Sequence, residues 1–419
     1  MSGEFKKVSV VGLGYIGLPT AAMLASRKVE VIGVDVNERA VEAVNRGEVL
    51  ITEPDLDMIV SAAVNQGFLR ATLTPEPADA FVVAVPTPFK DNHVPDLTYV
   101  EAATRAIAPV LKKGDLIILE STSPVTTTDQ MAAWLAEDRP DLKFPQDAGD
   151  DCDVCLAYCP ERVLPGKIMQ ELIKNDRVVG GMTPRCSDRA IALYRTFVEG
   201  KCFATSSRVA EMCKLVENAF RDVNIAFANE LSMICDDLGI NVWETIALAN
   251  RHPRVNILQP GPGVGGHCIA VDPWFIVSQS PDHAKLIRTG REVNDQKPEW
   301  VLGKVTTAIA KLKKQGHGTV KLACFGLAFK PDIDDLRESP ALEIAQTLSA
   351  LDGVELLAVE PFIDELPSGF GDHTKLVDAK TAAKDADVAV LLVDHTEFRT
   401  MDMGRFEGPI IDTRGIWRP

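Results

Sequence analysis

The glycine-rich segment 260–273 holds the residues whose types and spacing best suit covalent chemistry. Four glycines lie between Gly261 and Gly266, and the thiol of Cys268 follows shortly after them. Such a loop lets the backbone approach a ligand and turn N–H groups towards a developing negative charge. Asp272 could then orient water or transfer a proton. We interpret Cys268 as a candidate nucleophile, the alternative being a small buried side chain in a tight turn.

A second set of polar residues is expected on one long helix. Residues 207–239 show a helical pattern without proline that ends at a glycine. Because about thirty residues exceed an ordinary globular helix, we expect it to cross between domains and to pack against a partner chain. Lys214, Asn218 and Arg221 share one stripe, which is either part of a site or a solvated surface row. The expected buried face comprises Val209, Met212, Leu215, Val216, Phe220 and Val223.

Further charged residues follow the strand expected at 156–159 and the short helix expected at 243–250. Glu161 could activate water and Arg162 could bind a phosphate, although isolated loop charges are usually solvated. His252 and Arg254 lie on the loop that leads to Cys268. Several cations thus lie on elements that we expect to converge, as a diphosphate-bearing substrate requires: Arg162, Lys214, Arg221 and Arg254.

The first third of the chain predicts a dinucleotide-binding unit. A buried strand from Lys7 runs into Gly12, Gly14 and Gly17 in the pattern G-x-G-x-x-G, and a helix and a second strand follow. The three glycines would form the turn, admit a pyrophosphate and allow close helix packing, respectively. Asp35 ends the second strand, where it could bind ribose hydroxyls and repel a 2′-phosphate, which favours NAD over NADP. The alternative is a sheet that merely needs small residues at a crossing.

Hydroxyl residues follow the next strands of the same pattern. Thr87 follows the strand expected at 80–85, and Thr122 and Thr128 follow the strand expected at 115–119. The carboxyl ends of strands in a doubly wound sheet line the ligand crevice, so these threonines could contact the cofactor. Capping the next helix is an equally good interpretation for any one of them.

The last third repeats the opening pattern in weaker form. A strand at 320–329, a helix at 339–351 and a strand ending at Glu360 are expected, without a full glycine fingerprint. Lys330, Asp332, Arg337 and Arg414 lie at strand ends or just beyond them. We therefore predict a second, degenerate α/β domain that presents cations at the ends of its strands.

Length and composition limit the class of protein. A chain of 419 residues exceeds one core, so roughly two or three domains are expected. A net charge of −16 without a basic run argues against nucleic acid and anionic membranes, and no segment is long enough to span a bilayer. Nine irregularly spaced cysteines favour a reducing cytosol. Cys152, Cys155 and Cys159 have no second Cys/His pair nearby, so we interpret them as packing residues and expect no metal.

These motifs together resemble the UDP-glucose/GDP-mannose dehydrogenase family over essentially the whole chain. The segments that carry the resemblance are 12–17, 85–88, 120–124, 158–162, 214–220, 265–272, 329–332 and 337–339. The resemblance implies two Rossmann-like doubly wound parallel-sheet domains joined by a long central helix and a small helical dimerisation domain. The implied boundaries are 1–205 for NAD binding, 206–312 for the central helices and 313–419 for UDP-sugar binding.

The resemblance also implies the reaction, a four-electron oxidation of a primary alcohol to a carboxylate with two NAD. Cys268 resembles the nucleophile, Lys214 the oxyanion-stabilising group, Asn218 and Asp272 its support, and Glu161 the carboxylate used in thioester hydrolysis. The implied cofactor contacts are Gly12, Gly14, Tyr15, Ile16, Gly17, Asp35, Thr87, Thr122, Thr128 and Arg337. The implied substrate contacts are Arg162, Val163, Lys214, Asn218, Arg221, His252, Arg254, Gly265, Lys330, Pro331 and Arg414.

Two departures point to one branch of the family. Val271 and Pro165 stand where enzymes acting on UDP-glucose typically carry lysine and glutamate. Both fit a UDP-N-acetyl-hexosamine substrate, and the choice of epimer rests on resemblance alone. The expected protein is a cytoplasmic homodimer, or a higher oligomer. The nearest alternative is the same reaction on UDP-N-acetylglucosamine. The others are a UDP-glucose enzyme, a two-electron hydroxyacid dehydrogenase and a non-catalytic nucleotide-binding regulator.

Overall fold

The computed structural model describes residues 5–51, 53–90, 93–164, 166–266 and 268–417. The chain divides into two compact units, residues 1–217 and 218–419. The boundary falls inside helix α9 (Ser207–Asp237), the long helix that the sequence predicts. Each unit is described by itself.

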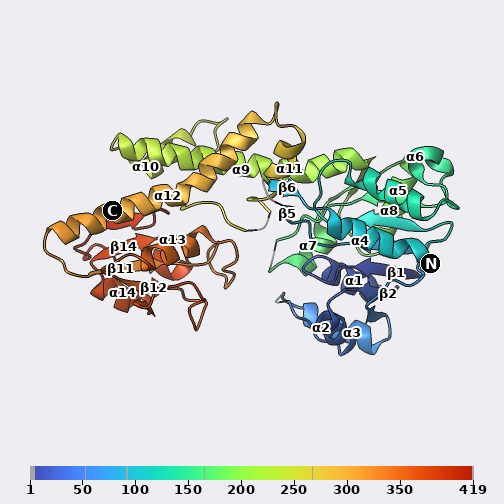
Figure 1. Ribbon diagram of the computed structural model, residues 1–419, viewed down its shortest axis with the longest axis horizontal. Helices are drawn as coiled ribbons and strands as arrows, with labels where there is room; N and C mark the ends of the chain where they lie inside the picture. The colour runs from blue at the N-terminus through green and yellow to red at the C-terminus, as the bar shows by residue number, and fades with distance from the viewer. Residues whose placement is uncertain (1–4, 52, 91–92, 165, 267, 418–419) are drawn as a thin grey trace. The chain divides into compact units, whose positions relative to one another are not determined.

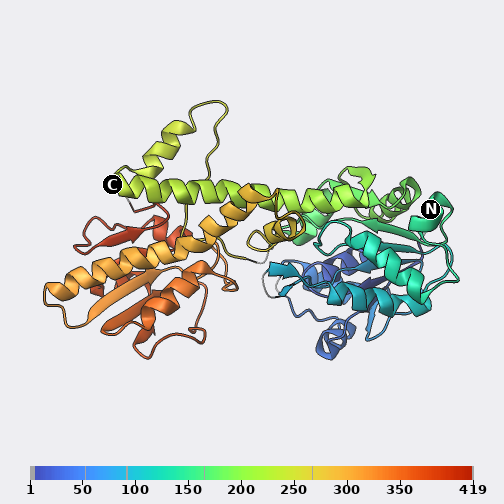
Figure 2. The ribbon, with the colours of Figure 1, turned by 45° about the horizontal axis from the view of Figure 1, so that its top comes forward.

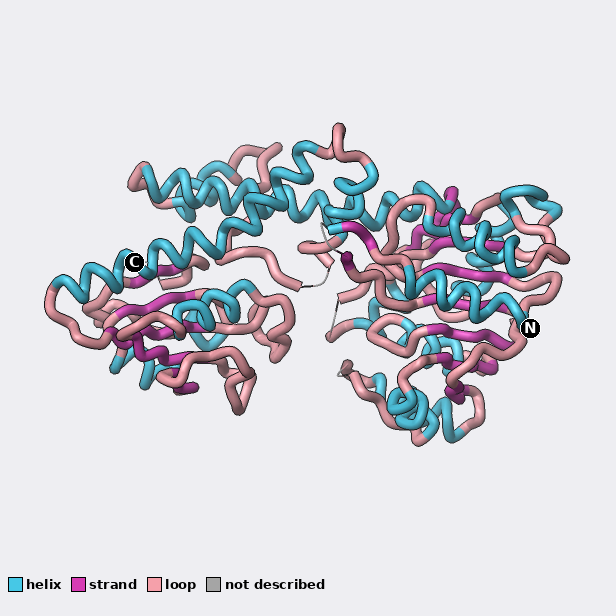
Figure 3. Tube along the Cα trace, viewed as in Figure 1, coloured by secondary structure: helices cyan, strands magenta, loops and turns pink. Residues whose placement is uncertain are grey.

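The first unit is built on one eight-stranded sheet (Figures 1 and 3). Its strands, in chain order, are β1 (Lys7–Val11), β2 (Glu30–Val34), β3 (Leu69–Thr72), β4 (Ala80–Val83), β7 (Leu116–Leu119), β8 (Cys155–Tyr158), β9 (Arg177–Gly181) and β10 (Cys202–Ser206). The spatial order is β10-β9-β8-β7-β4-β1-β2-β3, and neighbours are parallel except β8 and β9. The order reverses between β1 and β4, which is where a doubly wound sheet binds its ligand.

Helices cover both faces of this sheet, because its strands are apolar on both sides. Val8 and Val10 of β1 enter one core, with residues of α1 (Gly17–Ser26), α3 (Leu56–Asn65), α7 (Ile168–Lys174) and α8 (Pro184–Tyr194). Val11 enters the opposite core, with residues of α4 (Thr98–Ile107) and α5 (Thr127–Asp138). Neighbouring side chains of a strand point to opposite faces, and here both faces are buried. The unit also contains α2 (Glu38–Asn45), α6 (Pro145–Ala148) and a short hairpin of β5 (Phe89–Lys90) and β6 (Val94–Pro95).

The second unit contains a five-stranded, wholly parallel sheet (Figure 2). Its strands are β11 (Val320–Phe325), β12 (Val354–Val359), β13 (Thr374–Leu376), β14 (Val388–Leu391) and β15 (Ile410–Asp412), in the order β13-β12-β11-β14-β15. Helices α12 (Lys285–Lys314) and α13 (Pro340–Ser349) contribute to one of its cores, and α14 (Ala379–Asp385) and α15 (Thr396–Arg399) contribute to the other. This is the predicted second α/β domain, and the predicted α/β fold class is confirmed.

The two sheets share the same turn after their first strand. In the first, Gly12 N donates to Val34 O at 2.8 Å and Leu13 N donates to Asp35 Oδ2 at 2.8 Å. In the second, Gly326 N donates to Val359 O at 2.8 Å, and an acid again accepts the next amide, since Leu327 N bonds Glu360 Oε2 at 2.7 Å. The expectation of an internal repeat is therefore met at the level of individual hydrogen bonds.

The remaining helices of the second unit are α10 (Val242–Ala249) and α11 (Asp272–Gln279). The predicted buried face of α9 is wrong within the single chain. Of its six residues only Leu215 is buried, Val223 is half-buried, and Val209, Met212, Val216 and Phe220 are exposed. The face that is buried alternates small and polar residues, among them Ala210, Glu211, Asn218, Asp222 and Asn229. Apolar spacing shows that a face needs cover but does not show what provides it.

Among the described helices, none combines the length and the apolar character needed to cross a membrane.

Candidate active site

The glycine turn after β1 has the geometry that a bound pyrophosphate requires. Gly12 has φ +96°, and a Cβ there would collide with Ala84 O of β4's carboxyl end. A Cβ on Gly17 would collide with Gly12 O, which explains why α1 can begin so close to the strand. A Cβ on Gly14 would meet nothing within 4 Å, so the backbone there is open to a ligand. The surroundings of each glycine thus fit the role expected of it, and contact with the cofactor stays a prediction.

Asp35 holds the same turn from the next strand. Its Oδ2 accepts from Leu13 N at 2.8 Å, and its Oδ1 accepts from Asn37 N at 2.8 Å. The side chain is half-buried, and each oxygen retains a lone pair. Asp35 can thus orient the loop and still accept from ribose hydroxyls.

The three predicted threonines differ in what they bond. Thr87 Oγ1 donates to Thr122 O at 2.6 Å, which ties together the segments that follow β4 and β7. Thr128 Oγ1 donates to Glu211 Oε1 at 2.7 Å, and Glu211 also accepts from the amides of Thr126 and Thr128. The buried carboxylate of Glu211 on α9 thus caps the first turn of α5, and none of the three threonine side chains, all of which the structure describes, performs the capping role considered for them. Their contact with the cofactor stays a prediction.

A buried ionic cluster that the sequence did not indicate surrounds Glu161. Arg177 Nη2 lies 3.0 Å from Glu161 Oε2, and both side chains are almost wholly buried. The Arg177 guanidinium also stacks over the ring of Tyr194, whose hydroxyl donates to Glu120 Oε1 at 2.7 Å. Burial, opposed by the charge of Arg177, raises the pKa of Glu120 to about 7. Glu161 is therefore a fixed, paired carboxylate rather than a solvated loop charge.

Arg162 is engaged inside the first unit. Its guanidinium bonds Glu217 of α9 at 2.8 Å and the backbone oxygen of Asp176 at 3.3 Å. Val163 packs half-buried against the first core. Lys214 lies half-buried on α9, and none of the described residues forms a hydrogen bond or an ion pair with its ammonium group. A lysine without a carboxylate partner keeps its charge available for a ligand.

Asn218 lies one helical turn after Lys214 and begins the second unit. Its amide nitrogen donates to Asp272 Oδ2 at 2.5 Å, and both side chains are buried. Asp272 is the first residue of α11, and its N–H donates to Cys268 O at 2.9 Å. One hydrogen-bonded chain therefore connects α9 to the cysteine loop. The catalytic roles of these residues stay predictions.

Cys268 is exposed and lies in the turn that immediately precedes α11. The amino end of a helix favours negative charge close to it, such as a thiolate or an oxyanion. Gly265 and Gly266 bring the loop against the segment before α13, where Gly266 N donates to Glu338 O at 3.2 Å. A Cβ on Gly265 would collide with that same oxygen. The glycines are required because the loop passes directly over another backbone.

Two long helices clamp the cysteine loop through buried polar side chains. Arg291 of α12 is fully buried, forms a short ion pair with Asp222 of α9, and donates to Ile269 O at 3.4 Å. Asn229 of α9 accepts from Gly261 N at 2.9 Å. Asn294 of α12 links Asn229 to Asp222, because it accepts a hydrogen bond from Asn229 at 2.8 Å and donates one to Asp222 at 2.8 Å. The loop is therefore held at both ends by one network, which no local pattern indicated.

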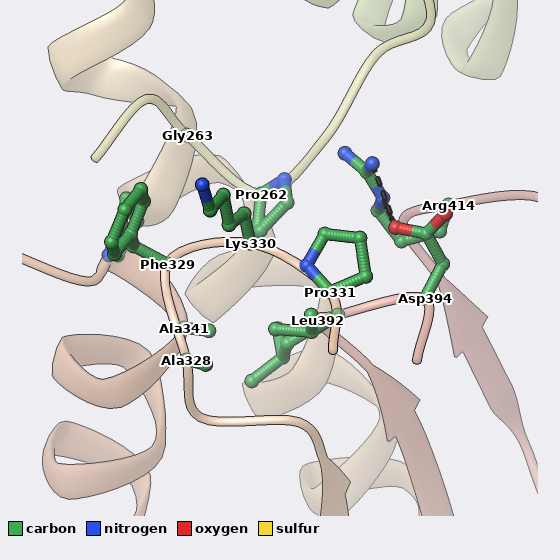
Figure 4. A pocket seen from close by; sticks show the side chains of 12 residues that line it. Pro262, Gly263, Ala328, Phe329, Lys330, Pro331, Ala341, Leu392, Asp394 and Arg414 are labelled. Atoms are coloured by element: carbon green, nitrogen blue, oxygen red, sulfur yellow. Dashed lines mark hydrogen bonds and ion pairs between the residues drawn. The ribbon is translucent and has the colours of Figure 1, made fainter. Parts of the chain in front are cut away.

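A pocket in the second unit collects several predicted substrate residues (Figure 4). It lies where the order of the five-stranded sheet reverses, between the ends of β11 and β14. Lys330 and Pro331 follow β11, Arg414 follows β15, and Pro262 and Gly263 of the cysteine loop form another wall. Arg414 Nε donates to Asp394 Oδ1 at 2.8 Å, which orients its guanidinium beside the pocket. An open α/β sheet binds ligands at such a position.

The acid of this second sheet is already satisfied. Glu360 Oε2 accepts from the amides of Leu327 and Ala328 and lies 3.1 Å from His395 Nε2. His395 Nδ1 in turn accepts from Asp332 N at 2.9 Å, which fixes the loop that carries Lys330. Glu360 occupies the position equivalent to that of Asp35 in the first sheet. Its carboxylate thus fixes a loop with two cations nearby and has little capacity left to accept hydrogen bonds from a ribose.

The remaining predicted residues lie on the surface of their units. Arg221 is exposed on α9, and His252 and Arg254 are exposed after α10, where Arg254 N donates to His252 Nδ1 at 3.3 Å. Arg337 forms an ion pair with Asp335 at 2.6 Å. Tyr15 is partly exposed on the glycine turn, and Ile16 precedes α1. Pro165 and His267 lie outside the described residues.

Comparison with known proteins places these features in one family. The chain matches three domains of the UDP-glucose/GDP-mannose dehydrogenase family in order: the NAD binding domain at residues 6–198, the central domain at 208–296 and the UDP binding domain at 323–419. The UDP-N-acetyl-D-mannosamine dehydrogenase of Escherichia coli strain K12 is 62% identical over 419 residues, with 99% of this chain and 100% of that protein covered.

Other relatives agree. The NDP-N-acetyl-D-galactosaminuronic acid dehydrogenase of Ralstonia nicotianae is 61% identical over 415 residues, covering 99% of this chain and 97% of that protein. The solved structure of the UDP-N-acetyl-mannosamine dehydrogenase Cap5O from Staphylococcus aureus is 42% identical and superposes with a TM-score of 0.84, covering 98% of this chain and 95% of that one. With its glycine turn, its cysteine loop and all three domains matched, the chain belongs to the UDP-glucose/GDP-mannose dehydrogenase family and carries that family's NAD-binding domain.

Proposed function

We propose that this chain oxidises C6 of UDP-N-acetyl-D-mannosamine to the carboxylate with two NAD, supplying a uronic acid for surface polysaccharide. The observation that carries the proposal is the placement of Cys268, on a glycine loop at the amino end of α11, joined to α9 through Asp272 and Asn218. The 62% identity to UDP-N-acetyl-D-mannosamine dehydrogenases supports the choice of sugar. The runner-up substrates are other UDP-N-acetyl-hexosamines and UDP-glucose.

The proposed chemistry needs one thiol and two hydride acceptors. The first hydride leaves C6 for NAD, a proton is lost from the hydroxyl, and an aldehyde forms. The Cys268 thiol adds to the aldehyde and gives a thiohemiacetal, which again carries O–H and C–H on one carbon. The second hydride then leaves for a second NAD, the hydroxyl loses its proton, and a thioester remains. Water opens the thioester, which releases the carboxylate and returns the thiol.

Each remaining residue has a proposed part. Lys214 stabilises the oxyanion at each stage, because a fixed cation is most effective where charge develops. Asp272, held by its hydrogen bond from Asn218, accepts and donates protons beside the loop that carries the Cys268 thiol. Glu161, fixed by Arg177, activates the water that opens the thioester. Lys330 and Arg414 bind the diphosphate of the nucleotide, which the match of residues 323–419 to a UDP binding domain supports.

We further propose a homodimer in the cytoplasm with the domain boundaries 1–205, 206–312 and 313–419. The support for a dimer is the exposed apolar face of α9. Phe220, Phe227 and Ile234 recur at seven-residue intervals, the spacing of one helical face, and their exposed fractions are 71%, 54% and 47%. Contiguous apolar surface on a helix favours cover by another chain, and a second copy supplies a matching face.

The test is NADH production with a panel of UDP-sugars: N-acetylmannosamine, N-acetylglucosamine, N-acetylgalactosamine and glucose. We expect the highest kcat/KM with UDP-N-acetyl-D-mannosamine and two NADH per molecule oxidised. One NADH per substrate would instead identify a two-electron dehydrogenase. Preference for another epimer would refute the proposed sugar while leaving the four-electron reaction intact.

A further inference from the structure

Three cysteine side chains meet in the interior of the first unit, remote along β8 from Glu161. Cys152 follows the 3₁₀ turn Gly149–Asp151, Cys155 begins β8, and Cys186 lies in the first turn of α8. Their Sγ atoms all lie within 4.8 Å of one another, and all three residues are buried. Glu161 lies beyond the opposite end of β8, so the cluster occupies the other edge of the sheet from the residues assigned to the reaction.

The spacing along the chain groups Cys152 and Cys155 with Cys159, and from sequence alone we interpret these three as packing residues. Cys155 and Cys159 do share a face of the strand, but the Cys159 thiol lies 3.8 Å from the Arg177 guanidinium, in the ionic cluster at the far end of β8. The third member of the cluster is Cys186, which packs against β8 because α8 covers that face. No sequence pattern joins residues 155 and 186.

The sulfur positions fit a shared cation. A metal–sulfur bond of about 2.3 Å places the sulfurs of a three-thiolate site about 3.8 to 4.0 Å apart. Cys152 Sγ and Cys155 Sγ are 4.0 Å apart, and the third sulfur lies within 4.8 Å of both. Small side-chain adjustments would therefore complete the coordination. A disulfide would need a sulfur separation of about 2.05 Å, much shorter than the observed distance.

The surroundings suit the negative charge that such a site would carry. Three thiolates with a monovalent or divalent cation leave a net negative charge. Arg185, next to Cys186, donates to the carbonyl oxygens of Asp150 at 2.6 Å and Cys152 at 3.0 Å, and Arg189 lies one turn further along α8. Thr183 Oγ1 lies 3.2 Å from Cys186 Sγ, where its hydroxyl can donate to a thiolate. Outer partners of this kind orient metal ligands.

We propose that Cys152, Cys155 and Cys186 form a binding site for one thiophilic d10 cation, Cu⁺ or Zn²⁺. The three thiols release their protons to solvent as the sulfurs bind the ion. Thiolate ligands select these ions over Mg²⁺ or Ca²⁺. The bound ion would fasten the 149–151 turn and α8 to the start of β8. This site is independent of the proposed reaction, so either can fail without the other.

The test uses the full chain with Cys268→Ser, so that the exposed thiol does not compete for metal. Zn²⁺ and Cu⁺ are titrated separately against a chromogenic chelator under reducing conditions. We expect one tightly bound equivalent of at least one of the two ions and a raised midpoint of thermal unfolding. Cys186→Ala in the same background should lose that equivalent, with affinity falling at least about 100-fold. Cys324→Ala, which removes an isolated buried thiol of β11, should keep it.

X-ray absorption on the Cys268→Ser chain reads the ligands directly and does not depend on a variant that folds poorly. Three sulfur neighbours at about 2.3 Å support the site. The proposal is overturned if neither ion binds stoichiometrically, or if Cys186→Ala binds the ion as tightly as its parent chain. Fewer than three sulfur neighbours in the absorption spectrum would also overturn it. The thiols would then be packing residues.

Discussion

Cys268 is one of nine cysteines, and its surroundings rather than its identity distinguish it. It is exposed at a helix amino end, whereas Cys324 is buried among apolar residues. Cys268→Ser should reduce turnover by at least about 1,000-fold with little change in substrate affinity, because the thioester cannot form. Steady-state NADH production and calorimetric binding check this. Cys202→Ser, a half-exposed thiol on the edge strand β10, serves as the control.

A substitution at Asp272 can distinguish the effect of its negative charge from the effect of its size and hydrogen bond. Asp272→Asn keeps the size and can still accept from Asn218, so the loop should keep its shape. The loss of a proton-managing carboxylate should lower kcat by about 100-fold or more and leave KM within a few-fold. A variant with full kcat would show that only the hydrogen bond matters. Circular dichroism and thermal unfolding monitor the fold.

Glu120 makes the stability of the first unit depend on pH. Burial raises its pKa to about 7, above the value of 4.5 of an unburied glutamate. Between pH 4.5 and pH 7 the folded state therefore keeps a proton that the unfolded state has lost. The contribution of this proton to the stability of the folded state is fully present below pH 4.5 and is lost as pH rises through 7. The stability of Glu120→Gln relative to the native chain should increase by about 1 to 3 kcal/mol as the pH rises from 5 to 8, because the neutral amide does not ionise. Unfolding midpoints at both pH values measure the difference, and a constant difference would contradict it.

At the scale of elements, α9 and α12 act as a clamp on the cysteine loop. Arg291→Leu leaves Asp222 buried without its cation, which should cost about 3 to 5 kcal/mol. The double variant Asp222→Leu/Arg291→Leu should recover part of that loss, since no unpaired charge remains. The unfolding midpoint measures stability, and the rate of iodoacetamide alkylation of Cys268 reports the loop. Lys375→Ala, which breaks an exposed pair with Glu355, should change neither.

At the scale of the molecule, the exposed face of α9 predicts the oligomeric state. If the proposed dimer forms, Phe220→Glu combined with Phe227→Glu should convert it to a monomer in multi-angle light scattering, because two charges would enter an apolar interface. Leu286→Glu supplies the matched control, since Leu286 is 70% exposed on α12 and outside that face. A native chain that is monomeric at micromolar concentration would refute the assembly.

The sequence by itself determined the features that depend on neighbours along the chain. Local backbone geometry and residue spacing determine the turn at Gly12, the strand that precedes Asp35, the long helix and the loop before Cys268. The residue types and order of these motifs also sufficed to indicate the family, which the three matched domains confirm.

Only the tertiary structure decided which distant side chains meet. Arg177 reaches Glu161, Arg291 reaches Asp222, and Cys186 joins Cys152 and Cys155, although no periodicity connects the members of these groups. The same limit explains the buried face of α9, where polar residues lie inside because each finds a partner there. A buried polar group is stable only when it is paired, and pairing is a property of the folded chain rather than of the local sequence.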